Sequence, residues 1–216
     1  MKIIKPSIKI ITDLDSINIP QLLESIGRTC YKSEDKINKH SAKKFVQMLI
    51  NHGHESVLEH FSISVTIICD RGVSHELVRH RLASYSQEST RYCNYANKDI
   101  EFIAPCWYFL NDNPNSACKI VFENSCVQAE VNYNKLIAQN LRPQDARAVL
   151  PNSLKTEIVM TANLREWRHF FKLRATAAAH PDMQYLAKLI LKEFNKKVPV
   201  IFEDIYKEVS KCLQQK

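Results

Sequence analysis

The sequence predicts an α+β fold: a single domain, residues 1–216, with a central mixed or antiparallel sheet flanked by helices. Strand-like and helix-like periods are interspersed along the chain without the regular alternation that builds a parallel sheet. The composition, with 45% hydrophobic and 25% charged residues over 216 positions, allows one large core and marks no second domain.

The N-terminal part is expected to contain one strand and two helices. Residues Ser7–Thr12 are a β-branched run typical of a strand, and Ile19–Cys30 has the apolar spacing of a helix with the stripe Leu22, Leu23 and Ile26. Ser41 can cap a second helix that runs to His52, where Gly53 follows as a stop.

The clearest strand is Phe61–Asp70, because apolar residues alternate there with serine and threonine. Arg71-Gly72 is predicted to be a turn, and Val73–Arg81 a helix whose last turn carries the basic triplet 79–81. An extended segment through Tyr92 should follow. Residues 94–114 have the composition of an irregular connection with a short strand near Phe102-Ile103.

Helices dominate the remainder. A long amphipathic helix is predicted over Ser116–Leu141, with one apolar face made of Cys118, Val121, Phe122, Cys126, Ala129, Tyr133, Leu136 and Ile137. Pro143 should begin a short helix that holds Arg147 and ends before Pro151. A strand is expected at Leu154–Ala162, and two amphipathic helices at Met183–Lys196 and Val200–Leu213.

The helix after Asn163 contains an unusual arginine. Asn163 can cap this helix, and its apolar stripe consists of Leu164, Trp167, Phe170 and Phe171. Arg174 continues the stripe, seven residues after Trp167. A guanidinium on a core-facing stripe is costly without a polar partner. Either the helix ends before Arg174, or Arg174 points into a polar pocket.

Composition excludes several classes of site. The three glycines, Gly27, Gly53 and Gly72, are isolated, so the chain has neither a P-loop nor a dinucleotide fingerprint, and any phosphate must be held by side chains. The seven cysteines are scattered and odd in number without a C-x-x-C pair, which argues against a disulfide framework or a thiolate zinc site. We expect a cytoplasmic protein, since no targeting segment or membrane-length apolar run is present.

The most unusual chemistry is concentrated in residues 75–92, where three arginines, two histidines and three serines occur together. Clustered guanidinium groups repel one another unless an anion is supplied, most simply a phosphate bound through paired hydrogen bonds. With a formal net charge of +7, the chain also favours anionic partners. A phosphorylated ligand is therefore expected. The alternative is a solvated basic helix face.

Five motifs together resemble those of the flavin-dependent thymidylate synthases. Arg79-His80-Arg81, seven intervening residues and Ser89, followed by Arg91-Tyr92, matches that family's R-H-R-x7-S signature. The other motifs are similar and occur in the same order: His54-x-Ser56-x-x-Glu59-His60, Ala146-Arg147-Ala148-Val149-Leu150-Pro151, Asn163-x-Arg165 and Leu173-Arg174. The resemblance covers nearly the whole chain.

The resemblance implies an enzyme that makes dTMP from dUMP. Methylenetetrahydrofolate would be the carbon donor, FAD the hydride carrier and NADPH the reductant. It also implies a homotetramer whose active sites are shared between subunits, with no membrane or nucleic-acid partner. In such a site the flavin carries the redox chemistry, and the protein positions dUMP and supplies counter-charge.

The resemblance also implies roles for the residues of each motif. Arg91, Arg147 and Ser89 would hold the dUMP phosphate, and Ser89 would be a ligand, not a nucleophile. The nucleotide would be framed by two segments, Glu76, Leu77, Val78, Arg79 and Gln87, Glu88, Ser89, Thr90, Arg91. Arg174 would face the pyrimidine as the catalytic residue, stabilising negative charge as the base ionises at N3.

The residues implied to bind FAD come from the same motifs. They are His54, Ser56, Arg79, His80, Arg81, Gln87, Asn163, Leu164, Arg165 and His169. Arg165 and His169 are four residues apart, so they can share one helix surface. Some family members have Gln where this chain has Glu76 and Glu where it has Gln87. Glu76 could instead form an ion pair with Arg79 or His80.

Three other interpretations compete with this one. Cys106 follows Pro105, as in the flavin-free thymidylate synthases, but its aromatic surroundings do not suit a catalytic thiolate, and we expect it to be packed. The group His52, His54, Glu59 and His60 lacks a known ligand spacing, so no metal site is expected. Arginines near Tyr85 and Tyr92 could also bind RNA, although Arg147, Arg165 and Arg174 on separate elements suit a pocket better.

Overall fold

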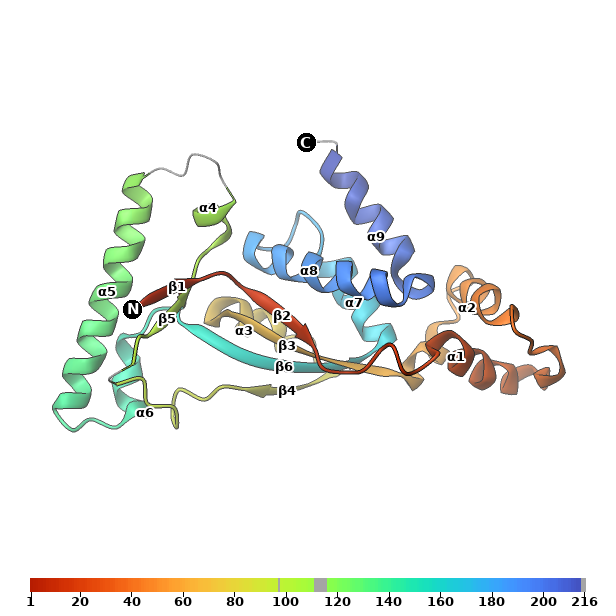
Figure 1. Ribbon diagram of the computed structural model, residues 1–216, viewed down its shortest axis with the longest axis horizontal. Coiled ribbons are helices and arrows are strands. Elements are labelled where there is room, and N and C mark those ends of the chain that lie inside the picture. The colour runs from red at the N-terminus through yellow and green to blue at the C-terminus, as the bar shows by residue number, and fades with distance from the viewer. Residues whose placement is uncertain (97, 111–115, 215–216) are drawn as a thin grey trace. The chain divides into compact units, whose positions relative to one another are not determined.

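A computed structural model describes residues 1–96, 98–110 and 116–214. It has mixed helices and strands, so the predicted α+β class is confirmed (Figure 1). The chain forms two compact units. Unit 1 comprises residues 1–7, 66–79 and 85–159, and unit 2 comprises residues 8–65, 80–84 and 160–216.

The strands are arranged in two sheets. β1 (Lys2–Ile4) pairs in parallel with β5 (Glu101–Ile103), with Ile3 opposite Phe102. The larger sheet has the order β2-β3-β6-β4, and its strands are β2 (Ser7–Ile10), β3 (Ser62–Asp70), β4 (Ala83–Gln87) and β6 (Lys155–Asn163). The predicted strands over 61–70 and 154–162 are confirmed. Alternation in β3 is strict, with Ile63, Val65, Ile67 and Cys69 fully buried.

Unit 2 is built around an aromatic core on α7 (Leu164–Arg174). Trp167, Phe170 and Phe171 from this helix pack with Phe194 of α8 (Pro181–Lys197) and Phe202 of α9 (Pro199–Gln214), and all five are fully buried. The Trp167 indole nitrogen donates to the carbonyl oxygen of Ile63 at 3.0 Å. This packing fixes the direction of α7, which carries several predicted site residues.

Two further helices complete unit 2. They are α1 (Ile19–Arg28), which continues into a 3₁₀ turn at Thr29–Tyr31, and α2 (Ser41–Asn51). A second 3₁₀ turn lies at Glu34–Lys36, and a third, η3 (Glu55–His60), packs on α7. Gly53, in the left-handed region at φ +72°, ends α2 as predicted. Of the predicted stripe of α1, Leu23 is buried and Leu22 is exposed.

Unit 1 has its own core beneath the long helix α5 (Ser116–Ala138). Cys126, Ala129 and Tyr133 of α5 pack with Ile100, Phe102, Ala146 and Leu154. The short helix α6 (Pro143–Ala146) and the 3₁₀ turn η4 (Arg147–Val149) follow, as predicted. An unpredicted helix, α4 (Cys106–Phe109), precedes the gap at 111–115, where part of the predicted irregular connection lies outside the described residues.

Four local predictions were wrong. Helix α3 spans Arg71–Leu77 because the Asp70 side chain caps it, accepting from the Val73 amide at 2.8 Å, so the basic triplet follows the helix instead of ending it. Ser41 does not cap α2: its hydroxyl donates to buried Glu24 at 2.7 Å and accepts from the Asn38 amide. Cys118 and Val121 are exposed, since the inner face of α5 runs through Cys126 and Tyr133. Tyr92 lies in a turn, because the extended segment ends before Thr90.

Within the described part of the chain, every helix is too short or too polar to span a lipid bilayer.

Candidate active site

The predicted site residues are divided between the two units. The nucleotide set lies in unit 1, except for Arg174, and the flavin set lies in unit 2, except for Arg79 and Gln87. The basic triplet itself is divided, since Arg79 ends one segment of unit 1 and His80 begins a segment of unit 2. Each unit therefore carries its own set of candidate ligands.

In unit 1 the predicted phosphate ligands come from two segments that are distant in sequence. Arg147 at the start of η4 donates from Nη1 to the Thr90 hydroxyl oxygen at 2.9 Å, although 57 residues separate them. The Arg91 amide donates to the Ser89 hydroxyl oxygen at 3.3 Å, and the Arg91 guanidinium lies 5.6 Å from the centre of the Tyr92 ring. Thr90 is buried, whereas Arg91 and Arg147 are exposed and keep donors available for a ligand.

The residues just before Ser89 are fixed by hydrogen bonds within unit 1. The Gln87 side-chain amide donates to the hydroxyl oxygens of Ser74 and Thr156 at 3.0 and 3.1 Å. Glu88 accepts from the Tyr95 hydroxyl at 2.8 Å and from Lys155 at 3.1 Å. Burial, and then the hydrogen bond to Glu88, raise the pKa of Tyr95, so its proton stays in place. These contacts hold β4 and the following loop in one conformation.

The other nucleotide segment lies at the end of α3. The backbone oxygen of Leu77 accepts from the Tyr85 hydroxyl at 2.7 Å, and the Leu77 side chain is buried. Val78 and Arg79 follow the helix and are exposed, and the Arg79 amide donates to the Glu76 carbonyl oxygen at 3.2 Å. Tyr85 therefore ties this segment to β4 within unit 1.

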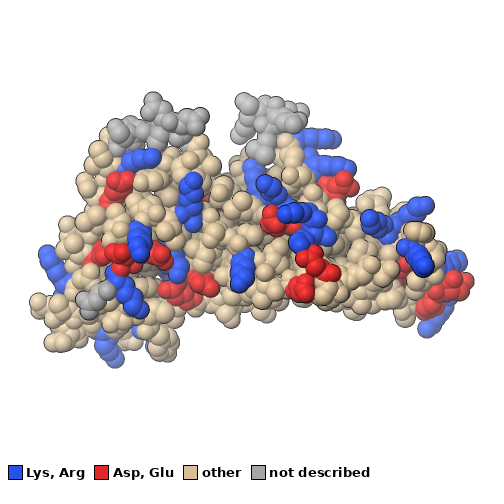
Figure 2. Space-filling model, in the orientation of Figure 1, with Lys and Arg blue, Asp and Glu red and all other residues tan. Residues whose placement is uncertain are grey.

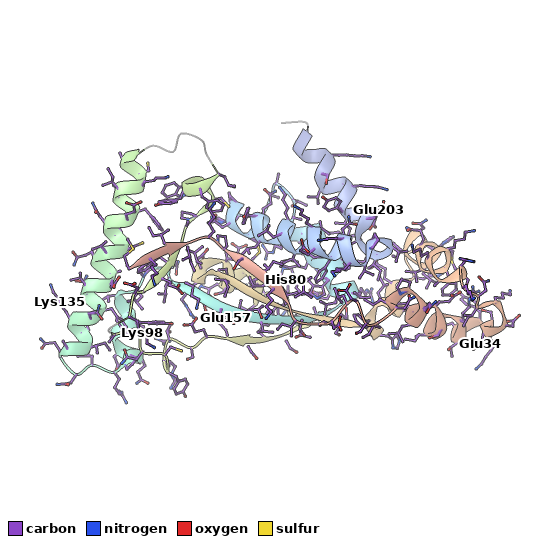
Figure 3. The ribbon with its side chains drawn as sticks, viewed as in Figure 1. Glu34, His80, Lys98, Lys135, Glu157 and Glu203 are labelled. Atoms are coloured by element: carbon purple, nitrogen blue, oxygen red, sulfur yellow. The ribbon has the colours of Figure 1, made fainter. Side chains whose placement is uncertain are left out.

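In unit 2 a buried histidine connects a carboxylate to the predicted catalytic arginine. His80 Nε2 lies 3.1 Å from Arg174 Nε, and His80 Nδ1 lies 3.3 Å from a Glu166 oxygen (His80 is labelled in Figure 3). Because a guanidinium can only donate, Nε2 must be the acceptor, so the ring proton is on Nδ1 and faces Glu166. Arg174 is the last residue of α7, so the helix does not end before it, and the first alternative is wrong. Its guanidinium instead contacts a polar partner, His80, in line with the second alternative.

His80 is held in its neutral form. Burial lowers its pKa, the Arg174 charge lowers it further, and the hydrogen bond to Glu166 opposes them without reversing the shift. His169 also lies close, with ring centres 6.2 Å apart. Protonation would put a hydrogen on Nε2 and break the contact with Arg174.

This histidine predicts a pH-dependent stability. Since its folded-state pKa lies below the ordinary value of 6.5, the unfolded chain binds more protons in that window. The free energy of unfolding should therefore be highest above pH 6.5 and decrease as the pH falls below it. The variant His80→Asn keeps a donor toward Glu166 but cannot titrate, so we expect it to flatten this pH dependence. Urea titrations between about pH 5 and 8, a range around the ordinary pKa of histidine, would measure the free energy of unfolding. Parallel curves for the variant and the wild type would contradict the assignment.

Three predicted flavin residues line one pocket in unit 2. Asn163, Arg165 and His169 surround a space of about 560 Å³ together with Glu55, Glu59 and Lys172. Asn163 caps α7 as predicted, accepting from the Glu166 amide at 2.9 Å, and this places Arg165 and His169 on one exposed face. Arg165 binds Glu59 at 2.5 Å, and its side chain is 54% exposed. Exposed pairs are weak, so an anionic ligand can replace Glu59.

The remaining flavin residues lie in the same unit. His54 and Ser56 are exposed on the loop and turn that enter η3, and Arg81 is exposed just after His80. Leu164 is fully buried, so only its backbone can face a ligand. The pocket offers a guanidinium, an imidazole and an amide as donors, and the carboxylates of Glu55, Glu59 and Glu166 also line it.

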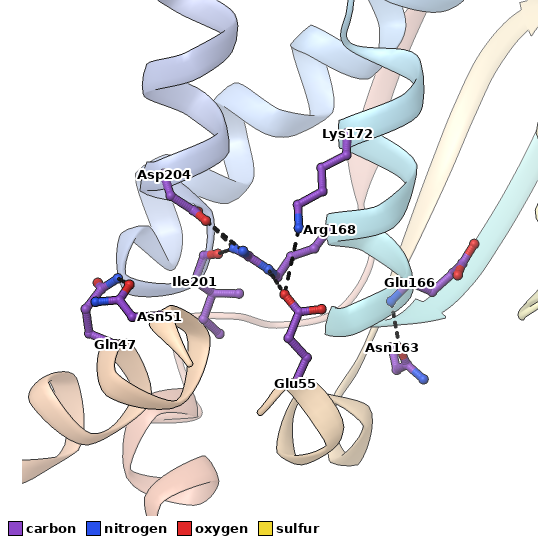
Figure 4. Close-up of polar contacts among 9 residues, drawn as sticks. All are labelled: Gln47, Asn51, Glu55, Asn163, Glu166, Arg168, Lys172, Ile201 and Asp204. Atoms are coloured by element: carbon purple, nitrogen blue, oxygen red, sulfur yellow. Dashed lines mark hydrogen bonds and ion pairs between the residues drawn. The ribbon is translucent and has the colours of Figure 1, made fainter. Parts of the chain in front are cut away.

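A buried arginine in unit 2, Arg168, was not predicted from the sequence. It binds Asp204 through two nitrogens at 2.8 and 2.6 Å and Glu55 at 3.1 Å, and it also donates to the Ile201 carbonyl oxygen (Figure 4). Burial alone would lower the pKa of Arg168, but Asp204 and Glu55 outweigh it and raise the pKa. The arginine links α7, α9 and η3, and thereby fixes one wall of the 560 Å³ pocket.

Comparison with known proteins identifies the family. A sequence profile described as "Thymidylate synthase complementing protein" matches residues 14–200. A protein named flavin-dependent thymidylate synthase from Mycobacterium tuberculosis (strain ATCC 25618 / H37Rv) is 35% identical over 214 residues, covering 92% of this chain and 84% of its own. The chain belongs to the flavin-dependent thymidylate synthase family.

Two further relatives carry the same name. One is from Corynebacterium aurimucosum, 36% identical over 197 residues that cover 86% of this chain and 79% of its own. The other is from Mycolicibacterium vanbaalenii, 36% identical over 199 residues, with 85% and 78% covered. The family inferred from the five motifs is therefore confirmed.

The structure bears on the rival cysteine assignment, and it also brings together a group of ligand-type side chains other than the one named from the sequence. Cys106 is 5% exposed at the start of α4, as expected for a packed thiol. Among the described residues, His80, Glu166 and His169 place ligand atoms within 4.8 Å of one another, as a metal would need. Both nitrogens of His80 are engaged, however, and the Arg174 guanidinium opposes a cation beside it. We assign this group to hydrogen bonding.

Proposed function

We propose that this chain catalyses the reductive methylation of dUMP to dTMP, with methylenetetrahydrofolate as carbon donor, FAD as hydride carrier and NADPH as reductant. Membership of the flavin-dependent thymidylate synthase family supports the reaction. The observation that carries the nucleotide assignment is the pairing of Arg147 with Thr90 beside Ser89 and Arg91 in unit 1. Cationic donors and hydroxyl groups from distant segments meet there, as a phosphate monoester requires.

The chain's own groups would bind and orient the nucleotide. Ser89, Arg91 and Arg147 hold the phosphate, and the Glu76–Arg79 and Gln87–Arg91 segments frame the sugar and base. Arg174, oriented by His80, faces the pyrimidine and stabilises negative charge on its ring. A guanidinium whose direction is fixed in advance needs little reorganisation during the reaction.

FAD would be held by residues of unit 2 and by Arg79 and Gln87. Asn163, Arg165 and His169 contribute the donors of the 560 Å³ pocket, and His54, Ser56, His80, Arg81 and Leu164 would add contacts around it. When bound, the flavin supplies hydride transfer, which no side chain of the protein can perform.

We further propose a cytoplasmic homotetramer with shared active sites, in which residues 1–216 act as one domain. Support for assembly comes from α5, where Ile120, Val127 and Val131 recur on one helix face and are 55%, 45% and 39% exposed. Apolar helix faces of this kind are typical of protein interfaces. Strands β3 and β6 each contain residues of both units, which supports one domain.

The reaction is tested by its optical signature. Purified protein titrated with FAD and reduced by NADPH without oxygen should be reoxidised when dUMP and methylenetetrahydrofolate are added together, and dTMP should form. A colourless protein that takes up no FAD and binds RNA with a steep salt dependence would favour the RNA-binding interpretation instead. On the face drawn in Figure 2, basic side chains lie among acidic ones, which does not suit a continuous RNA track.

Ser89→Ala tests the ligand role of Ser89. The hydroxyl is expected to contribute one hydrogen bond to the phosphate, so the KM for dUMP should rise about tenfold while kcat is largely kept. Steady-state kinetics with saturating folate would measure both. Complete loss of turnover, together with a covalent nucleotide adduct on Ser89 of the wild type, would show that this serine is a nucleophile.

A further inference from the structure

A buried carboxylate in unit 2, that of Glu166, lies outside the five motifs and has no role in the proposed function. Glu166 is the third residue of α7 and is 5% exposed. Its backbone amide donates to the Asn163 side chain, so the N-terminal cap fixes this turn of the helix (Figure 4). Its carboxylate lies 3.3 Å from His80 Nδ1, although 86 positions separate the two residues. A buried carboxylate is costly without a hydrogen-bond partner, and His80 supplies one.

Glu166, His80 and Arg174 form one chain of hydrogen bonds inside unit 2. Arg174 Nε donates to His80 Nε2 at 3.1 Å. Burial, and then the Arg174 charge, lower the pKa of His80, which keeps the ring neutral. A neutral imidazole has one protonated nitrogen, so Nδ1 must donate when Nε2 accepts. The Glu166 carboxylate accepts this proton.

The carboxylate determines which edge of the His80 ring faces the arginine. Side chains of a helix lean toward its N-terminus, so Arg174 at the end of α7 reaches back along the helix to His80. Phe170 packs against the same ring edge to face, with ring centres 5.0 Å apart. Apolar packing of this kind fixes the plane of the imidazole, but it does not distinguish a nitrogen from a carbon. The hydrogen bond from Nδ1 to Glu166 makes that distinction.

We infer that Glu166 is a positioning residue, which holds the His80 ring so that its Nε2 directs the Arg174 guanidinium toward the pyrimidine. This inference rests on the proposed function, which assigns Arg174 to the pyrimidine. Without the carboxylate, the ring can turn over or carry its proton on Nε2. A C–H or an N–H then faces the Arg174 donor, and neither group accepts a hydrogen bond. The arginine loses its fixed direction and must be reoriented during the reaction.

The kinetic test removes the acceptor from this chain. Glu166→Met keeps most of the side-chain volume and has no carboxylate. Single-turnover oxidation of reduced flavin by dUMP and methylenetetrahydrofolate should be slower by about 10- to 100-fold, with FAD still bound. Glu166→Gln keeps an oxygen that can accept from His80 Nδ1, so it should recover most of the rate. In the Arg174→Ala background, Glu166→Met should add less than about a twofold loss, because the two residues act as one unit.

A second measurement is independent of turnover. The ¹⁵N chemical shifts of the imidazole nitrogens, recorded at neutral pH on protein labelled in its histidines, report which nitrogen carries the proton. The His80 signals are those missing from the spectrum of His80→Asn. We expect the proton on Nδ1 in the wild type. A proton on Nε2 would overturn the inference, since Nε2 could not then accept from Arg174.

Glu24→Met is the matched control, because Glu24 is also a buried carboxylate of unit 2. It accepts from Arg28 at 2.8 Å and from the Ser41 hydroxyl at 2.7 Å, and it belongs to α1. Its loss should lower the free energy of unfolding and leave the single-turnover rate of the folded protein unchanged. An equal loss of rate in Glu24→Met and Glu166→Met would show that general destabilisation, and not positioning, slows the reaction.

Three other results would overturn the inference: an unchanged rate in Glu166→Met, losses that multiply in the double variant with Arg174→Ala, or a loss confined to FAD affinity. The last result would place Glu166 in the cofactor site. Should Glu166→Met fail to fold, Glu166→Leu is put through the same comparison with the same criteria. Wild-type turnover in Arg174→Ala alone would instead contradict the proposed function, because that variant does not alter Glu166.

Discussion

Arg174→Ala is expected to lower dTMP formation by about 10²- to 10³-fold, the usual cost of removing a preorganised donor from a site where charge develops. Flavin should remain bound, because the predicted flavin donors Asn163, Arg165 and His169 lie nearer the start of α7 and around a separate pocket. The structure gives Arg174 a fixed direction through His80, which is itself held by Glu166. Single-turnover oxidation of reduced flavin by dUMP and folate would measure the loss.

Arg165→Ala is the control for this prediction. Both arginines belong to α7, and Arg165 is its second residue whereas Arg174 is its last. We expect Arg165→Ala to weaken FAD binding and to recover turnover at high FAD concentration, the opposite behaviour to Arg174→Ala. Loss of flavin from Arg174→Ala, with normal turnover per bound flavin, would remove Arg174 from the pyrimidine and place it with the cofactor.

Arg174 illustrates what the sequence could predict. Its place on an apolar stripe is enough to indicate a polar partner, because a buried guanidinium without one is too costly. The identity of that partner was not predictable, since His80 lies 94 residues away. The strand at 61–70 followed from the alternation of apolar and polar residues, and the strand at 154–162 from its β-branched residues. These predictions depended on the kinds and spacing of residues within one helix or strand, which can be seen in the sequence itself.

The errors came from contacts that span long sequence distances or from competition between capping groups. Ser41 has the right residue type for a cap, but its hydroxyl donates a hydrogen bond to buried Glu24 instead. Gly72 suggested a turn after Arg71, whereas Asp70 caps a helix that begins at Arg71. Arg168 is four residues after Leu164, and this spacing indicates that it lies on the buried face of the helix. Its ion-pair partners Glu55 and Asp204 could not be predicted, because they are distant in sequence.

That buried arginine predicts the largest effect on stability. Arg168 is 2% exposed and satisfies Asp204, Glu55 and the Ile201 carbonyl oxygen from three different elements. Arg168→Ala leaves Asp204 and Glu55 with only the more distant cation Lys172, which lies 3.9 Å from Glu55, and removes one donor from the Ile201 carbonyl oxygen. We expect the free energy of unfolding to decrease by about 3 kcal/mol, at the lower end for a broken buried ion pair because Asp204 and Glu55 are partly exposed. Urea titration at pH 7 would measure it.

Lys172→Ala is the matched control, because Lys172 also approaches Glu55, at 3.9 Å, but is 50% exposed. Its loss should change the free energy of unfolding by less than about 0.5 kcal/mol.

Burial alone would raise the pKa of Asp204, but Arg168 outweighs it and lowers the pKa below 3.8. The stabilisation from this carboxylate is therefore complete above pH 3.8 and is lost as the pH falls through the lowered value. The difference between wild type and Arg168→Ala should shrink in the same range. If Arg168→Ala were as stable as Lys172→Ala at pH 7, the arginine would not be the group that joins α7, α9 and η3.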